Sequence, residues 1–177
     1  ERHFDPSQIV DNRVLWIGRD EENRQPEVVL EYARQNPDAE VFMVFGGERY
    51  RESVKRYNIP DNVQLEFALS QDEVFALMNT AKVYWNSSKF DTFAMPLTEA
   101  LAMGKIIVKP SHPCYDHINS THAFSGNDQN WFELVNMALA SPTKFSLENR
   151  MYAFDRFSSS VMKQGYQDFF DKWLAGD

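Results

Sequence analysis

Apolar and polar residues alternate along this chain with two different periods. Short runs rich in β-branched and aromatic residues are typical of buried strands. Five such runs predict strands at residues 14–17, 41–45, 63–67, 82–85 and 106–108. The run at 106–108 is apolar at every position, as in a parallel strand that is covered on both faces.

Amphipathic segments separate these runs and predict helices. In residues 27–35 the apolar side chains recur at helical spacing. Ser70 and Glu73 form a capping box that opens a second helix. Pro96 suits the first turn of a third helix, which Gly104 ends. The remaining helices are predicted at residues 48–57, from about 128, from 147 and over 159–174.

Strands that alternate with helices in this way predict an α/β fold with a doubly wound parallel sheet. We assign residues 1–177 to a single domain, which is long enough to bury a substantial core. In such sheets, ligands bind at the carboxyl ends of the strands, where helix N-termini point their amides. The fold class does not name the ligand, so the function has to be argued from the motifs.

Composition and charge exclude several classes of function. The formal net charge is −8 and the pI is near 5.0, which argues against a protein that wraps nucleic acid through a general basic field. A local basic pocket for a small anion remains compatible with this charge. No apolar run approaches the roughly 18 residues of a membrane span. The first residues lack the charged-then-apolar pattern of a leader, so we expect no secretion signal. With Cys114 as the only cysteine, we expect no disulfide and a cytoplasmic protein.

Residues 87–104 carry the candidate chemistry. Asp91 lies in a predicted loop, and Glu99 follows in the first turn of the next helix. A carboxylate near that amide-rich end can accept hydrogen bonds from the diol of a ribose, while free N–H groups hold a diphosphate. Alternatively, Glu99 only complements the helix dipole and Asp91 only starts a turn. The spacing alone does not decide between these readings.

The same segment resembles the acid-x7-acid signature of retaining GT-B glycosyltransferases, E-G-F-G-x-P-x-x-E-A-M-A-x-G. Gly18-Arg19 followed by Arg24 is similar to the family's G-R-x4-K, and residues 36–39 resemble its P-D-A stretch. Residues 62–67 match the strand whose following loop contacts the base, and residues 157–174 resemble the closing helix. The direct matches within the signature are Phe93, Pro96, Glu99, Ala100, Ala102 and Gly104.

The resemblance implies the C-terminal half of a GT-B enzyme, which binds a nucleoside diphosphate sugar as its donor. Arg19 and Arg24 would neutralise the leaving diphosphate, and Asp91 would address the sugar hydroxyls, so these three are the candidate catalytic residues. Glu99 would hold the ribose. The other candidate donor-binding residues are Gly18, Phe67, Ala68, Leu69, Thr92, Phe93, Ala94 and Met95.

The implied activity is transfer of a hexose-type sugar with retention, without a metal or a cofactor. An N-terminal domain that is absent from this chain would bind the acceptor, so we expect the isolated domain to be inactive. The chain departs from the family pattern at several places. Asp91 replaces a glutamate, Arg24 replaces a lysine, and Thr92 and Ala94 replace glycines. After residue 108, Ser-His-Pro-Cys stands where the family has a glycine pair.

Two other classes of function stay open on these residues. One is a non-catalytic α/β module that binds a nucleotide or a protein. The other is a sugar-nucleotide 2-epimerase with the GT-B fold. His112, Cys114, Asp116 and His117 fall within six residues, but this spacing has no second half elsewhere and Pro113 stiffens the loop, so we expect no metal site.

Overall fold

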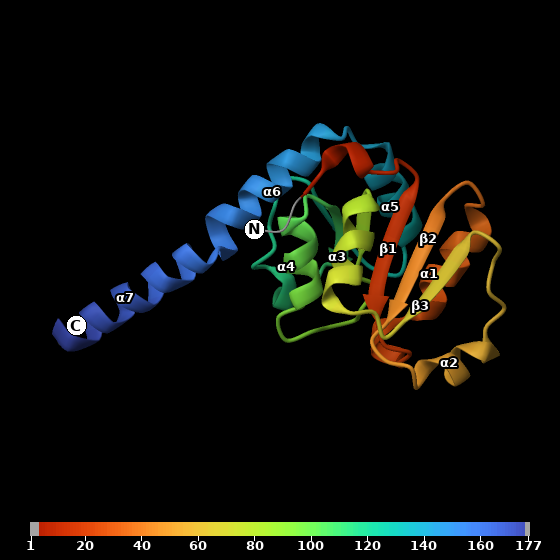
Figure 1. Cartoon of the computed structure of the whole chain (residues 1–177), viewed down its shortest axis with the longest axis horizontal. Helices are drawn as coiled ribbons and strands as arrows, with labels where there is room; N and C mark the ends of the chain where they lie inside the picture. The colour runs from red at the N-terminus through yellow and green to blue at the C-terminus, as the bar shows by residue number, and fades with distance from the viewer. Residues whose placement is uncertain (1–3, 176–177) are drawn as a thin grey trace.

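The computed structural model describes residues 4–175, which contain a six-stranded parallel sheet. The strands lie in the order β3-β2-β1-β4-β5-β6, so the sheet grows from β1 first in one direction and then in the other (Figure 1). The strands are β1 (Arg13–Gly18), β2 (Glu40–Phe45), β3 (Val63–Phe67), β4 (Val83–Trp85), β5 (Ile106–Pro110) and β6 (Ala123–Gly126).

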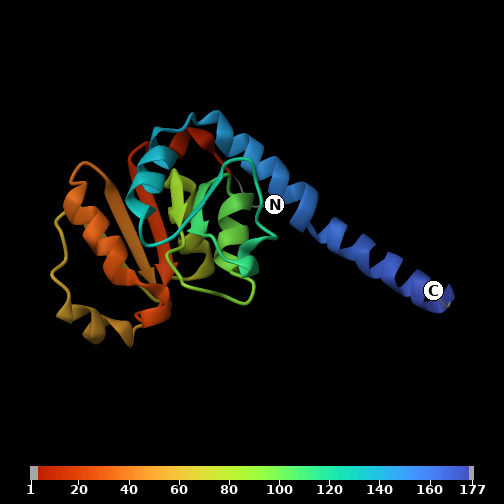
Figure 2. The ribbon, with the colours of Figure 1, turned by 180° about the vertical axis from the view of Figure 1, so that it is seen from behind.

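Helices cover both faces of this sheet. The face seen in Figure 1 carries α3 (Gln71–Thr80) and α4 (Met95–Ala102), and α6 (Lys144–Phe157) packs against α4. The opposite face carries α1 (Pro26–Gln35) and α5 (Trp131–Ala140), as Figure 2 shows. This arrangement confirms the predicted doubly wound α/β fold. The remaining helices are α2 (Tyr50–Ser53), after β2, and α7 (Ser159–Ala175), after α6.

Alternation of side chains along β1 divides the core between the two faces. Val14 and Trp16 belong to the apolar cluster under α1 and α5, whereas Leu15 belongs to the cluster under α3 and α4. Strand β5 is buried along its whole length, as expected for a parallel strand that is covered on both faces. The Trp16 indole also donates a hydrogen bond to Ser87 Oγ at 2.9 Å, which connects β1 to the loop after β4.

Some elements differ from the sequence prediction. Strand β6 was not predicted, because its segment Ala-Phe-Ser-Gly has little strand propensity and is held by pairing with β5. The predicted helix at 48–57 is interrupted: α2 is followed by the 3₁₀ turn Val54–Arg56. Only Tyr50 and Val54 of this segment are buried, so little packing is available to support a longer helix. Helix α6 begins at Lys144, three residues earlier than predicted.

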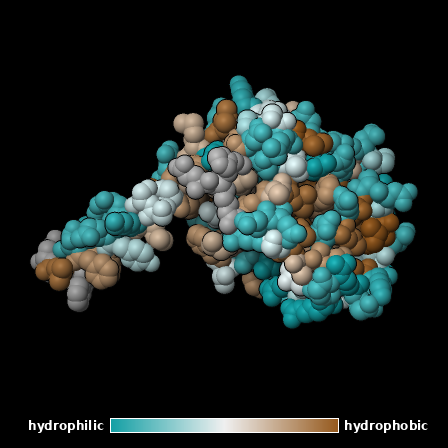
Figure 3. All heavy atoms as spheres, in the orientation of Figure 1, coloured by the Kyte–Doolittle hydropathy of each residue, from teal (hydrophilic) through white to brown (hydrophobic). Residues whose placement is uncertain are grey.

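Helix α7 extends away from the rest of the fold (Figure 1). Its aromatic side chains Tyr166 and Phe169 are 61% and 62% exposed. Figure 3 shows apolar and polar side chains side by side along this projecting helix. The helix therefore contributes little to the buried core.

Gly104 ends α4 in a conformation and an environment that require glycine. Its φ of +68° lies in the left-handed region, and a Cβ there would stand 2.7 Å from the carbonyl oxygen of Ser146 in α6. We expect Gly104→Ala to lower the free energy of unfolding by about 1–3 kcal/mol, because it adds backbone strain and a clash with main chain. Chemical denaturation followed by circular dichroism measures this loss.

Gly165→Ala in α7 is the matched control. Nothing lies within 4 Å of the position that its Cβ would take, and alanine is favoured over glycine by about 1 kcal/mol within a helix. We therefore expect this variant to be neutral or slightly more helical. Equal effects of the two substitutions would contradict the assigned role of Gly104.

Candidate functional site: a basic cavity between the ends of β1 and β4

The order of the strands reverses between β1 and β4, and the loops that leave these two strands meet there. In open α/β sheets this reversal opens a crevice at the carboxyl ends of the strands. The loop after β1 contains the 3₁₀ turn Glu22–Arg24 and leads into α1, and the loop over residues 86–94 leads from β4 into α4. The motif residues from both parts of the sequence therefore lie at one edge of the sheet.

Hydrogen bonds hold these two loops against each other. Ser87 Oγ accepts from the Trp16 indole and donates to the carbonyl of Arg24 at 2.7 Å. The Lys89 amide donates to the carbonyl of Asn23 at 2.8 Å. The bonds donated by Ser87 and Lys89 each end on a main-chain carbonyl of the loop after β1, which limits how far the loops can move apart.

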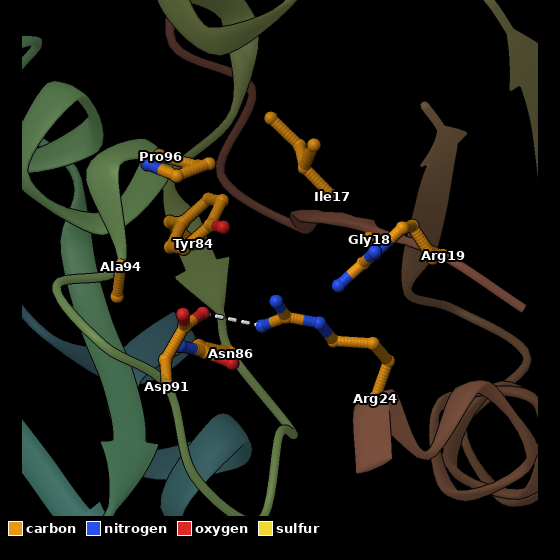
Figure 4. A pocket seen from close by; sticks show the side chains of 9 residues that line it. All are labelled: Ile17, Gly18, Arg19, Arg24, Tyr84, Asn86, Asp91, Ala94 and Pro96. Atoms are coloured by element: carbon orange, nitrogen blue, oxygen red, sulfur yellow. Dashed lines mark hydrogen bonds and ion pairs between the residues drawn. The ribbon is translucent and has the colours of Figure 1, made fainter. Parts of the chain in front are cut away.

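An ion pair between Arg24 and Asp91 joins the same loops (Figure 4). Arg24 Nη1 contacts a carboxylate oxygen of Asp91 and also donates to Ser88 Oγ at 3.0 Å. The two side chains are only 17% and 18% exposed, so solvent ions screen this pair less than a surface pair. Burial lowers the pKa of Arg24, but the hydrogen bond and the charge of Asp91 raise this pKa by more. Arg24 is therefore a fixed, permanently charged group.

A cavity of about 210 Å³ opens beside this ion pair. In Figure 4, Arg19 and Arg24 approach it from the loop after β1, while Asp91 and Ala94 lie on the opposite side. Arg19 is less constrained, because its Nη1 lies 3.3 Å from Glu21 and both side chains are about half exposed. The other lining residues are Ile17, Gly18, Tyr84, Asn86 and Pro96.

Gly18 couples this cavity to the core. A Cβ at this position would lie 2.4 Å from the Trp16 ring, so no other residue fits without displacing the indole. The Gly18 carbonyl accepts a hydrogen bond from the Gly46 amide at 3.1 Å, which aligns the ends of β1 and β2. Packing in the core therefore fixes the backbone at Gly18, which lines the cavity.

Three non-glycine residues within 4–175 adopt the left-handed backbone conformation, and all three lie at this edge of the sheet. They are Gln25, Ala68 and Ala94, with φ of 51–52°. A residue with a side chain is about 1–2 kcal/mol less stable there than in the right-handed region. Ala94 is the N-cap residue of α4, borders the cavity and makes no side-chain cap hydrogen bond. Pro96 has no amide hydrogen and the Leu97 amide donates to the Ala94 carbonyl at 2.9 Å, so the Met95 amide is the donor that this helix start can offer to an anion.

The cavity brings together five of the predicted site residues: Gly18, Arg19, Arg24, Asp91 and Ala94. Seven others lie outside its lining. Thr92, Phe93 and Met95 belong to the adjoining loop and helix start, and Phe93 stacks on His117 with the ring centroids 4.8 Å apart. Phe67 ends β3, two strands away from β1, and Ala68 and Leu69 follow it. Ala68 donates its amide hydrogen to the carbonyl of Phe45 at 3.0 Å, at the end of β2.

Glu99, the seventh of these residues, lines a different hollow. This second cavity, of about 240 Å³, lies between α4 and α6 and also includes Met95. Glu99 Oε1 accepts a hydrogen bond from Gln71 Nε2 at 3.3 Å, at the start of α3. The two carboxylates of the motif thus face different cavities, and the roles assigned to them stay predictions.

Sequence reasoning missed Tyr84 and Asn86. Tyr84 is buried, and this burial raises the pKa of its phenol. Its place within an apolar strand gave it the pattern of a core residue. Asn86 is the first residue after β4, and its side-chain oxygen accepts a hydrogen bond from the Ser88 amide at 3.0 Å. Its position at the carboxyl end of a strand is the signal that could have identified it.

The cysteine and histidines after β5 make separate contacts. His112 Nδ1 lies 3.1 Å from Cys114 Sγ, and His117 Nε2 lies 3.2 Å from the carbonyl oxygen of Phe93. Within residues 4–175, no three His, Cys, Asp or Glu side chains are grouped so as to hold a metal ion. In the same part of the chain, no helix combines the length and the apolar character needed to cross a membrane.

Comparison with known proteins identifies the class. The parallel sheet with helices on both faces is the Rossmann-like α/β fold of GT-B glycosyltransferases of known structure. The sequence matches the family Glycosyl transferases group 1 over residues 2–151, and the chain belongs to this family. None of the curated proteins matches the sequence significantly.

Several solved structures share the fold at low sequence identity. Sucrose-phosphate synthase from Thermosynechococcus elongatus is 17% identical, with a TM-score of 0.78 over 93% of this chain and 46% of its own. A glycosyltransferase from Rickettsia africae ESF-5 is 16% identical, with a TM-score of 0.75 over 93% and 48%. HepE from Anabaena, in complex with UDP and glucose, is 16% identical, with a TM-score of 0.72 over 90% and 48%. The chain therefore spans less than half the length of each.

Proposed function

We propose that this chain is the domain of a retaining glycosyltransferase that binds a nucleoside diphosphate sugar and supports transfer of a hexose-type sugar. One observation carries the proposal: Arg19 and Arg24 meet the uncapped start of α4 in a cavity at the reversal point of the sheet. Two guanidinium groups beside the positive end of a helix dipole form a site for a diphosphate. The family to which the chain belongs supports this choice of substrate class.

The proposed chemistry depends on charge that develops on the leaving diphosphate. Arg24 is already held by Asp91 and Ser88, so its guanidinium needs little reorganisation when that charge grows. Arg19 is more exposed and can exchange its contact with Glu21 for a phosphate oxygen. In this proposal the two arginines stabilise the bond-breaking step without a metal ion.

Asp91 is proposed to accept hydrogen bonds from the hydroxyls of the donor sugar. One carboxylate oxygen contacts Arg24, and the other accepts from the Thr92 amide at 2.8 Å. Each oxygen keeps a further lone pair, so the carboxylate can still accept a hydrogen bond from a sugar hydroxyl. Because Asp91 is one methylene shorter than the glutamate of the family motif, a bridging water can supply the missing reach.

Glu99 is proposed to hold the ribose, and the contact with Gln71 supports this role. Gln71 begins α3 and comes shortly after residues 67–69, which are the proposed site of the base. A ribose that links a base at this loop to a diphosphate beside Arg19 would pass the start of α4. Glu99 would then exchange its hydrogen bond from Gln71 for bonds from the ribose diol.

The acceptor is proposed to bind a second domain that these residues do not include. The solved relatives are more than twice as long as the part that this chain matches, and HepE holds UDP and glucose in its own structure. We expect the 177-residue chain to bind UDP but to release no sugar from UDP-glucose above background, because positioning and exclusion of water need both sides of a cleft. An assay of UDP release measures this, and robust turnover by the chain alone would overturn the two-domain proposal.

Arg19 provides the direct test of the diphosphate site. We expect Arg19→Met to weaken binding of UDP about five- to thirtyfold, because a hydrogen bond to a charged group is lost at a half-exposed position. Binding of uridine should not change, because uridine has no phosphate. Arg34→Met is the matched control, since Arg34 is an exposed arginine paired with Glu31. Calorimetry that finds equal losses of affinity for uridine and UDP, or equal effects of the two variants on UDP binding, would contradict this assignment.

A second pair of variants separates the two carboxylates. We expect Glu99→Gln to weaken the binding of uridine, UDP and UDP-glucose alike, about tenfold, because all three carry the ribose. Asp91→Asn should leave uridine unchanged and remove only the additional affinity that glucose gives to UDP-glucose. Asp91→Asn should not weaken the binding of UDP, because this substitution frees Arg24 from a competing carboxylate. If both variants give the same pattern across the three ligands, the separate roles are wrong.

A further inference from the structure

Lys109 is a buried lysine whose ammonium group has no partner among the described residues 4–175. In the described part of the chain three lysine side chains are buried, and two of them are paired: Lys82 with Asp11 at 2.9 Å, and Lys105 with two main-chain carbonyls at 2.7 and 3.1 Å. Lys109 is only 5% exposed, yet no residue among 4–175 forms a hydrogen bond or an ion pair with its ammonium group. Lys109 lines a cavity, and no carboxylate of the described residues is paired with its ammonium group, so this position is suited to binding an anion.

Lys109 lines a cavity of about 610 Å³ at the carboxyl ends of β5 and β6. Ser125 of β6 is its register partner, and residues in register on parallel neighbours point to the same face of the sheet. The segment after β5 forms the rest of the wall with Ser111, His112, Asp116 and Asn119. This is the segment in which the glycine pair of the family motif is replaced.

The polar groups of this cavity suit an anion that also carries hydroxyls. Lys109 supplies the positive charge, and Ser111, Ser125 and Asn119 supply neutral donors and acceptors. His112 Nδ1 accepts from the Cys114 amide at 3.2 Å, which leaves the ring hydrogen on Nε2 as a further donor. Asp116 accepts hydrogen bonds only, so it is suited to hydroxyl groups and unsuited to a second anion. Burial lowers the pKa of Lys109, and the charge of Asp116 offsets this only in part.

We propose that this cavity binds a phosphate monoester, with Lys109 contacting the phosphate and Asp116 contacting hydroxyls of the molecule that carries it. The site is distinct from the cavity of Arg19 and Arg24, and the proposal does not rest on the proposed function. The two cavities are neighbours, because the Asp91 amide donates to Cys114 Sγ at 3.5 Å in the turn that borders the new site. A ligand in the Lys109 cavity is thus in a position to affect the ion pair between Arg24 and Asp91.

The experiment titrates the 177-residue chain with inorganic phosphate, glucose 6-phosphate and glucose. Calorimetry measures the affinities, and amide shifts in NMR spectra locate the binding. We expect both phosphates to shift amides of residues 109–126, and glucose to have no effect. Tighter binding of glucose 6-phosphate than of inorganic phosphate would support a phosphate monoester, whereas equal affinities would identify a site for the free ion and overturn the role of Asp116. Shifts confined to residues 18–24 would overturn the proposal.

Lys109→Met is the decisive variant, because methionine keeps the apolar stem and removes the charge. We expect this variant to bind glucose 6-phosphate about tenfold to a hundredfold more weakly and to bind UDP with unchanged affinity. Lys55→Met removes one lysine charge at an exposed site and should change neither ligand. Ser125→Asp is the second variant: it supplies a resident carboxylate beside Lys109 and should abolish phosphate binding even if Lys109→Met fails to fold. Unchanged affinity in either folded variant would overturn the proposal.

Discussion

The contact between the loops after β1 and β4 is the constraint on which the candidate site depends. The ion pair of Arg24 with Asp91 acts together with the bonds through Ser87 and Asn23, so charge and main-chain geometry reinforce each other. The packing of Gly18 on Trp16 fixes the start of the same region from the core side. A substitution in this contact would therefore change the shape of the cavity as well as its charge.

Much of the fold follows from local pattern. The runs at 41–45 and 63–67 lie in β2 and β3, and the capping box of Ser70 and Glu73 forms at the start of α3 as predicted. These features depend on short-range periodicity and on side chains a few residues apart. Strand β6 could not be predicted in this way, because Ala-Phe-Ser-Gly becomes a strand only through its pairing with β5.

The candidate site could also be predicted in part, because part of its motif is local in the sequence. The motif identified Arg19, Arg24 and Asp91, which the fold brings to one cavity. Motif spacing did not reveal that Asp91 pairs with Arg24, or that Glu99 lies beside Gln71, because both contacts join segments far apart in the sequence. Lys109 was not predicted for a related reason: a lysine at the end of an apolar strand gives no local sign that its side chain will line a cavity.

The left-handed backbone at Gln25, Ala68 and Ala94 has a consequence for recognition. Glycine at these positions would sample many conformations in the free protein, and each would have to be given up when a ligand binds. A residue with a side chain samples fewer, so less conformational entropy is lost on binding. The same stiffness narrows the range of ligand shapes that these loops can follow. The edge of the sheet is therefore better suited to selecting one kind of ligand than to adapting to many.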